Sequence, residues 1–452
     1  MSQLEIDPSQ AKSKISSVTK NNQTSAFLPR KDIEMKKSRL IGLLCASSIL
    51  TPVLVWAQAA APPAAPAATS FTAALTGGKA HGDIRYRYEY VDQTGILNTA
   101  NANTIRTRLS YQTEKFKGFS GLVEFENITS LNNKNYNDTI NGRTTYATVA
   151  DPEDTLVNRA FIEYSGIPKT TITLGRQGIA FDNQRFVGGS AWRQNDVTFD
   201  AFVVKNQAIP NVALTYAYAN QVNRIFGTRS VQGTWHDTNI HLLNFGYAKP
   251  SFGKLSVYGY MLDLPQALAL STSTIGARYE ITKPLGQGVT GGFAVELARQ
   301  SDYASNPANY SVNYFAIEPV LNCGQWQFKA LYESIEGDGT RAFQFPLGTN
   351  HVFDGLVDKF LTTPNRGLID MSISARYSVR STNPFFNNLK ATFAYHDFSA
   401  QNGNMDYGTE WNLHIEQTIK THYSFGVKIG SYNAGGLFTD TYKFMPYIGF
   451  KF

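Results

Sequence analysis

The residues best suited to binding a ligand are arginines that recur at every second position. Arg85 and Arg87 form one such pair, and Arg106 and Arg108 form another. In an extended segment, residues two positions apart project from the same face, so each pair offers two guanidinium groups to one side. A guanidinium presents a planar fork of donors that fits a carboxylate. These four residues therefore predict a surface that attracts anions, or else one that neighbouring glutamates neutralise.

Three further arginines, Arg176, Arg185 and Arg193, share one segment with Asp196 and Asp200. The aspartates can hold the guanidinium groups in place through bidentate pairs. A connection with so many charges is better explained if it folds into a polar interior than if it extends into water. Arg176 has the same parity as two apolar neighbours, so it faces away from the interior unless a bulge intervenes or it lies at a rim.

Catalytic and metal chemistry have little support. None of the seven histidines lies in a metal-binding spacing with carboxylates. Cys323 is the only cysteine beyond the N-terminal region, which excludes a cysteine-based metal site and an intrachain disulfide there. His414 lies near Asn412 and Glu416, but no nucleophile accompanies it. We therefore expect no enzyme, no metal and no cofactor.

The arginines fall in runs of about ten residues in which apolar and polar side chains alternate, as in membrane-spanning β-strands. The last run is the clearest, with one nearly apolar face that ends at Phe452. About eighteen such runs occur, an even number as in bacterial barrels. They lie near 84–90, 105–111, 118–128, 156–165, 170–178, 196–204, 211–221, 238–248, 254–262, 273–282, 288–299, 310–320, 324–334, 367–378, 388–398, 407–417, 421–432 and 441–452.

The connections between these runs alternate in length. Long links at 129–155, 179–195, 222–237 and 335–366 alternate with links of a few residues. Short periplasmic turns and long outer loops are typical of outer-membrane barrels, in which closure leaves no unpaired edge in lipid. We expect an all-β fold, a transmembrane antiparallel β-barrel of about 18 strands, over residues 78–452. A secreted sandwich or propeller, the alternative, does not produce this alternation.

The N-terminal region predicts export. Residues 35–59 combine Lys36, Lys37 and Arg39 with an apolar stretch and a small-residue cleavage site, which indicates a signal peptide. Residues 1–34 are interpreted as a start codon set too early or an extension, and the Ala/Pro-rich residues 60–77 as a linker. The first 59 residues carry eight basic and four acidic residues, so they account for +4 of the net charge of +6. The remaining +2 excludes a strongly cationic, nucleic-acid-binding chain.

Several short motifs resemble the alginate-export family of outer-membrane porins. They are Gly175-Arg176-Gln177, Arg185-Phe186-Val187-Gly188, Trp192-Arg193-Gln194-Asn195 and Thr198-Phe199-Asp200-Ala201, together with residues 353–364. The resemblance implies a bacterial outer-membrane channel that passes an anionic polyuronate or acidic sugar through an electropositive, arginine-lined lumen. The path would include Arg85, Arg87, Arg106, Arg108, Arg176, Arg185 and Arg193, with Asp196 and Asp200 as supporting carboxylates.

Other cargoes and partners follow from the same interpretation. The charges on the predicted lumen faces nearly balance, so a general diffusion porin of mixed selectivity and a structural or adhesin barrel without transport remain alternatives. Expected partners are outer-membrane lipid and lipopolysaccharide, the barrel-assembly machinery through the strand ending at Phe452, and periplasmic polysaccharide-synthesis components.

Overall fold

The computed structural model describes residues 68–131 and 135–452. The predicted extension at 1–34, the signal peptide at 35–59 and residues 60–67 of the linker lie outside the described residues. The last part of the predicted linker contains a short helix, α1 (Phe71–Thr76), whose first turn is capped by Ser70. Among the described residues, no helix has the length and hydrophobicity to cross a membrane.

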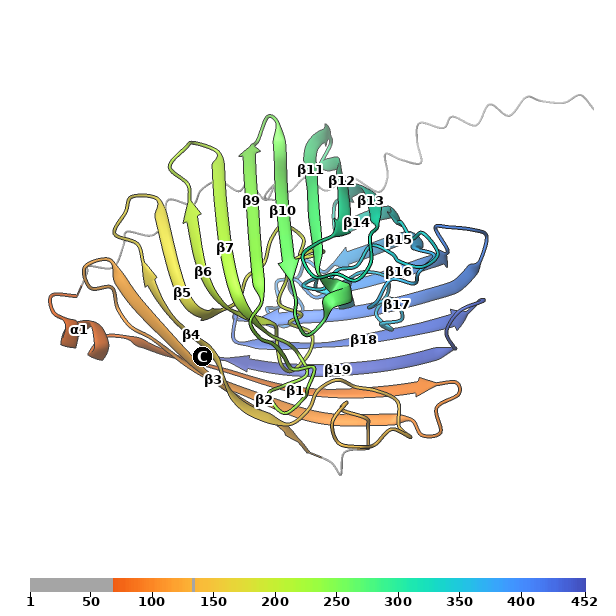
Figure 1. Cartoon of the computed structure of the whole chain (residues 1–452), viewed down its shortest axis with the longest axis horizontal. Coiled ribbons are helices and arrows are strands. Elements are labelled where there is room, and N and C mark those ends of the chain that lie inside the picture. The colour runs from red at the N-terminus through yellow and green to blue at the C-terminus, as the bar shows by residue number, and fades with distance from the viewer. Residues whose placement is uncertain (1–67, 132–134) are drawn as a thin grey trace, which may run out of the picture. The chain divides into compact units, whose positions relative to one another are not determined.

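The rest of the described chain forms one antiparallel sheet of 19 strands (Figure 1). β8 (Thr234–Trp235) is a two-residue strand at the end of β7, and the other strands confirm the eighteen predicted runs. These are β1 (Lys79–Gln93), β2 (Ala100–Gln112), β3 (Phe119–Ser130), β4 (Asp154–Tyr164), β5 (Thr170–Gln177), β6 (Thr198–Asn206), β7 (Val212–Asn223), β9 (Asn239–Lys249), β10 (Gly253–Asp263), β11 (Thr272–Gly286), β12 (Val289–Asp302), β13 (Ser311–Cys323), β14 (Trp326–Ile335), β15 (Leu368–Ser378), β16 (Lys390–Ser399), β17 (Asp406–Ile419), β18 (Tyr423–Ala434) and β19 (Thr441–Lys451).

The sheet closes because β1 pairs with both β2 and β19. At this seam the backbone N–H of Gly82 donates to the carbonyl of Phe452, and the N–H of Phe452 donates to the carbonyl of Gly82, each at 3.0 Å. The Phe452 ring lies over Gly82, where a Cβ atom would come within 2.1 Å of it. Closure satisfies the hydrogen-bonding groups of both outer strands, which an open sheet in lipid could not do.

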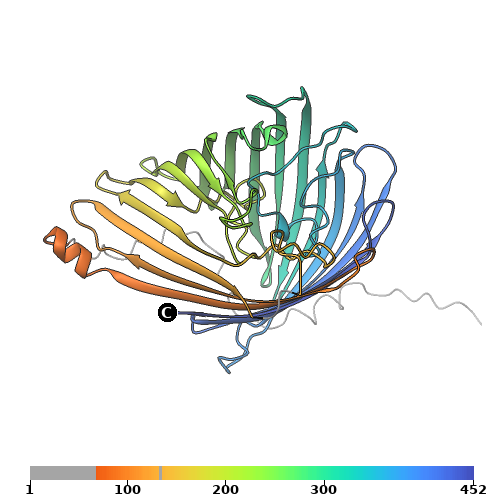
Figure 2. The same cartoon turned by 60° about the horizontal axis from the view of Figure 1, so that its bottom comes forward.

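The two ends of the barrel differ as the sequence predicts. One end, the turn end, carries short connections such as 287–288 and 324–325. Gln287 and Gly288 both have positive φ angles, 50° and 76°, which suit a tight hairpin turn. The opposite end, the loop end, carries the long connections 131–153, 178–197 and 336–367. Figure 2 shows connecting segments inside the curve of the sheet.

Side chains alternate between a lipid-facing and a lumen-facing surface. On β15, Met371 and Ile373 are 57% and 64% exposed, whereas Asp370, on the opposite face of the same strand, is fully buried. On β19, Ile448 is exposed and Lys443 is buried. The terminal run therefore has the predicted phase, with its apolar face outward. The lumen-facing side chains are buried because loops fill part of the interior.

Candidate functional site

Two loops meet inside the barrel. Residues 178–197 connect β5 to β6, and residues 336–367 connect β14 to β15; together we call them the plug. Their backbones run side by side, with the N–H of Gly188 donating to the carbonyl of Leu347 at 2.8 Å and the N–H of Thr349 donating to Gln184 at 2.9 Å. The sequence predicted that the charged connection around Arg185 folds into the lumen, and the structure places it there.

On one side the plug packs against aromatic rings of the barrel wall. The ring centroid of Phe186 lies 5.1 Å from that of Tyr258 on β10 and 5.4 Å from that of Tyr314 on β13. Phe343 and Phe345 of the second loop pack around the same ring, at 5.8 and 5.3 Å. The lumen face of β10 and β13 supplies tyrosines instead of alternating charges, so this side of the lumen forms an apolar core.

Arg185 joins the two loops to the wall at the edge of this core. Its guanidinium donates to Glu333 on β14 at 2.9 Å and to Asp354 of the second loop at 2.8 Å, and its side chain is 1% exposed. Burial raises the pKa of Asp354 well above its usual value, although Arg185 opposes the shift. Arg185 is therefore a structural cation that holds the plug.

The same carboxylates form the group in the described part of the chain that could hold a metal ion. Glu333, Asp354 and Asp370 each place an oxygen within 4.8 Å of the others. Arg185 already pairs with two of them, and His396 contacts Asp370 at 2.9 Å. Arg185 therefore supplies positive charge to the cluster, and the His396 ring contacts its third carboxylate.

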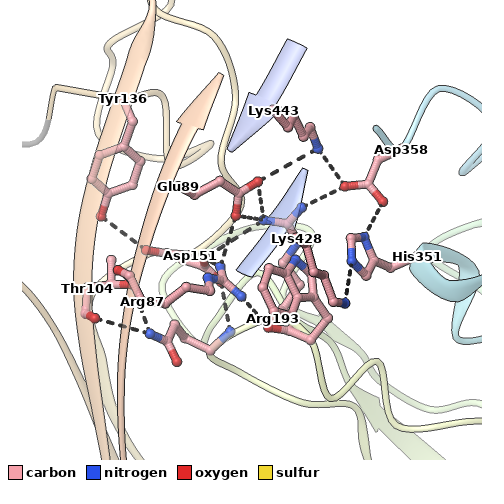
Figure 3. Close-up of polar contacts among 12 residues, drawn as sticks. Arg87, Glu89, Thr104, Tyr136, Asp151, Arg193, His351, Asp358, Lys428 and Lys443 are labelled. Atoms are coloured by element: carbon pink, nitrogen blue, oxygen red, sulfur yellow. Dashed lines mark hydrogen bonds and ion pairs between the residues drawn. The ribbon is translucent and has the colours of Figure 1, made fainter. Parts of the chain in front are cut away.

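The opposite side of the plug is held by charges (Figure 3). Arg193 lies 3.2 Å from Glu89 on β1 and 2.9 Å from Asp358 of the second loop. Lys443 on β19 contacts Asp358 at 2.6 Å, and His351 contacts it at the same distance. Burial alone would raise the pKa of Asp358, but His351, Lys443 and Arg193 hold it well below its usual value. Asp358 thus joins both loops to the wall.

The arginines of β1 and β2 are more fully paired than an open cationic surface would be. The carboxylate partners are Glu89 and Asp151 for Arg87, Asp83 for Arg106, and Glu126 and Asp196 for Arg108. Asp196 also contacts Arg159, at 3.1 Å. Neighbouring carboxylates therefore neutralise Arg87, Arg106 and Arg108, as the second of the two predictions for this cluster expects. Two of these carboxylates, Asp151 and Asp196, come from loops far along the chain.

Arg85 differs from those three. Its guanidinium donates to the carbonyls of Ala191 and Trp192, at 2.8 and 3.2 Å, and to the Gln194 side chain at 3.1 Å. Its contacts among the described residues include no carboxylate. Arg85 holds the plug backbone and keeps its positive charge uncompensated.

Arg176, by contrast, lies outside the lumen. It shares a face of β5 with Leu174, which is 62% exposed, and it pairs with Asp200 through two hydrogen bonds of 2.7 and 3.0 Å. Asp200 shares its face of β6 with the exposed Phe202. The placement of Arg176 in the substrate path is therefore corrected, because its parity puts this ion pair on the outer rim at the loop end.

Two more cations resemble Arg85 in having no carboxylate partner among the described residues. Lys428 on β18 places its Nζ 3.0 Å from His351 Nε2, and Arg376 on β15 donates to Thr392 at 3.1 Å. Cross-strand pairing sets Arg376, Thr392, His414 and Lys428 in one row across β15 to β18. Alternation alone shows that Lys428 and Arg376 face the lumen, but it does not reveal which lumen cations lack a partner.

His351 explains how the ammonium of Lys428 is accommodated. Its Nδ1–H donates to Asp358, so Nε2 is free to accept from Lys428. Burial lowers the pKa of His351 to about 3, with Lys428 adding to the effect and Asp358 opposing it. His351 is therefore a neutral acceptor in the plug.

The comparisons with known proteins agree with this architecture. Residues 79–221 match the family model described as alginate export. No curated protein matches the chain. The family match covers the segment that carries Arg85, Arg108 and Arg193, and it confirms the resemblance for the motifs between Gly175 and Ala201.

Several solved structures are similar to this chain in fold, among them the outer membrane protein OpdK of Pseudomonas aeruginosa. OccAB4 of Acinetobacter baumannii has a TM-score of 0.67 at 11% identity, covering 83% of this chain and 98% of that chain. OccK9 (OpdG) of Pseudomonas aeruginosa has a TM-score of 0.66 at 11% identity, with 84% and 99% covered. OccK2 (OpdF) of Pseudomonas aeruginosa, in complex with glucuronate, has a TM-score of 0.64 at 11% identity, with 83% and 98% covered. At such identity the likeness establishes the fold, a closed β-barrel of the outer-membrane type, and the family model relates residues 79–221 to alginate export.

Proposed function

We propose that this barrel conducts anionic solutes, with carboxylate-bearing sugars, from single uronates to an alginate-like polyuronate, as its cargo. The observation that supports this proposal is the set of uncompensated lumen cations: Arg85, Arg376 and Lys428. A buried or half-buried charge without a counter-ion is costly, so each of these groups gains from an incoming carboxylate. Cations that line a narrow pore favour anions.

The paired arginines have another role in this proposal. Arg87, Arg108 and Arg193 are neutralised by carboxylates, so they position the plug and contribute little net field. The path would follow the wall from β15 through β18 to β1, where the uncompensated cations lie. The solved neighbour in complex with glucuronate shows that a barrel of this fold binds an acidic sugar, which makes glucuronate a suitable first probe.

Planar-bilayer recordings test the proposal. In a salt gradient the wild type should show a reversal potential that favours anions, and glucuronate and short polyuronates should block the current more strongly than neutral sugars of equal size. Neutralising Arg376 and Lys428 (R376Q and K428Q) should reduce the anion preference. The matched control is Lys329→Gln, because Lys329 is already paired with Glu318 at 2.9 Å.

The recordings also separate the alternatives. A general diffusion porin would show weak selectivity and equal block by charged and neutral sugars. A folded barrel that passes no current under any condition would be structural, and the transport proposal would then fail.

A further inference from the structure

Trp192, in the first plug loop, lies against the uncompensated ammonium of Lys428. The ring centroid of Trp192 is 3.8 Å from Lys428 Nζ and 4.6 Å from the Cζ atom of Arg87. The ring of His351 stacks on it at 5.0 Å with an interplanar angle of 7°, and Tyr447 meets it edge-on at 5.8 Å. Trp192 is 8% exposed, so it shields Lys428 from the lumen.

The indole ring is held differently from its own backbone. The carbonyl of Trp192 accepts hydrogen bonds from both Arg85 and Arg87, which fix the main chain. The buried indole Nε1–H has no hydrogen-bond partner among the described atoms. The ring can therefore leave its position without breaking a hydrogen bond, while the main chain stays anchored.

The site beneath the ring suits a carboxylate. Lys428 supplies a buried ammonium whose contacts in the described chain are the His351 nitrogen and the Trp192 ring. Cation–π attraction and one neutral acceptor compensate a buried charge only in part. A carboxylate would pair with the ammonium directly, and it can reach it only when the ring has moved.

We infer that Lys428 forms a carboxylate-binding site that the Trp192 side chain covers as a lid. This inference rests on the proposed function and deepens it, since it names the site at which an acidic sugar is recognised. Ring displacement and carboxylate binding are then linked, and each favours the other by the same free energy. A neutral sugar, which gains nothing from the ammonium, would not displace the ring.

Removing the lid should strengthen binding of the acidic sugar. We would titrate full-length, folded wild type, W192A and W192F with glucuronate, following block of the ion current, with glucose as the neutral control. W192A should bind glucuronate about 3- to 30-fold more tightly, which corresponds to the loss of one buried cation–π contact. W192F keeps an aromatic ring over the ammonium and should lie near the wild type. Glucose should be unaffected in all three.

A double variant keeps the test specific. In W192A/K428M the gain in glucuronate affinity should disappear, because the ammonium that the ring covers is absent. Equal glucuronate affinity in wild type and W192A would contradict the proposal that Trp192 covers the site. So would a gain in affinity that persists in W192A/K428M. If the wild type conducts anions selectively, the proposed function stands and this inference alone fails; if the wild type shows no anion selectivity, the proposed function itself fails. Heat-modifiable gel migration confirms that each variant is folded.

Discussion

The plug is attached to the barrel in two chemically different ways. Toward β10 and β13 it is held by a cluster of aromatic rings around Phe186. Toward β1, β18 and β19 it is held by ion pairs and by cation–π contacts on Trp192. Apolar packing has no preferred competitor in water, whereas every contact on the charged side can be exchanged for a contact with a dissolved anion. The aromatic side therefore acts as the fixed attachment, and the charged side as the one that a substrate can change.

The largest expected effect comes from breaking the aromatic attachment. Phe186→Ala removes a partly buried ring that packs against five others. Truncating a fully buried Phe typically costs about 3–5 kcal/mol, so we expect a cost near the lower end, about 3 kcal/mol. We expect a loosened plug, a lower free energy of unfolding and a larger single-channel conductance. Because the contact is apolar, the increase in conductance should be the same at low and high salt. Phe186→Leu is the matched control and should retain most of the wild-type behaviour.

An intermediate effect is expected from pH, through His351 on the charged side. Its pKa is about 3 in the closed plug, whereas a hydrated histidine titrates near 6.5. Between these values the released loop binds a proton that the closed one does not, so acidification favours release by at most about 1.4 kcal/mol per pH unit. Asp358, whose pKa is already low, and Arg193 stay charged across this range. Open probability should rise from pH 7 to pH 5, and His351→Gln should flatten the profile. A pH response identical in H351Q would contradict this assignment.

The smallest effect is expected at the outer rim. Arg176→Ala removes a bidentate pair with Asp200, but the two side chains are 25% and 30% exposed, and exposed ion pairs contribute about 1 kcal/mol or less. We expect unchanged conductance and selectivity, with a small shift in unfolding. A marked loss of anion preference in R176A would place Arg176 in the path after all.

The strands, their phase and the loop lengths were predictable because each rests on local pattern. Alternation around Phe452 and Lys443 is set by the two-residue period of a strand, and a one-residue error would put charges into lipid. The entry of the first plug loop into the lumen was also predictable, since Arg185 and Arg193 need polar surroundings, whereas the entry of the second loop was not predicted.

The partners within the lumen were not predictable from sequence. Arg193 meets Glu89 and Asp358, which are 104 and 165 positions away, and no local pattern encodes such a contact. For the same reason Arg85 and Arg87 look alike in sequence, although within the described residues Arg87 alone of the two contacts carboxylates. The Trp192 ring lies over Lys428 because of the path that the loop takes, and sequence spacing does not define that path.

The glycine at the seam has a consequence for how the barrel is assembled. The terminal ring fills the space that a side chain at position 82 would need, so the Phe452 ring fits at this position only because residue 82 is glycine. Hydrogen bonds between strands repeat every two residues and would tolerate a shift of the last strand by two positions. Such a shift would place the Phe452 ring against the side chain of Ala80 or Ile84, where there is no room for it. The shape of this pair therefore selects one alignment of the first and last strands at the moment of closure.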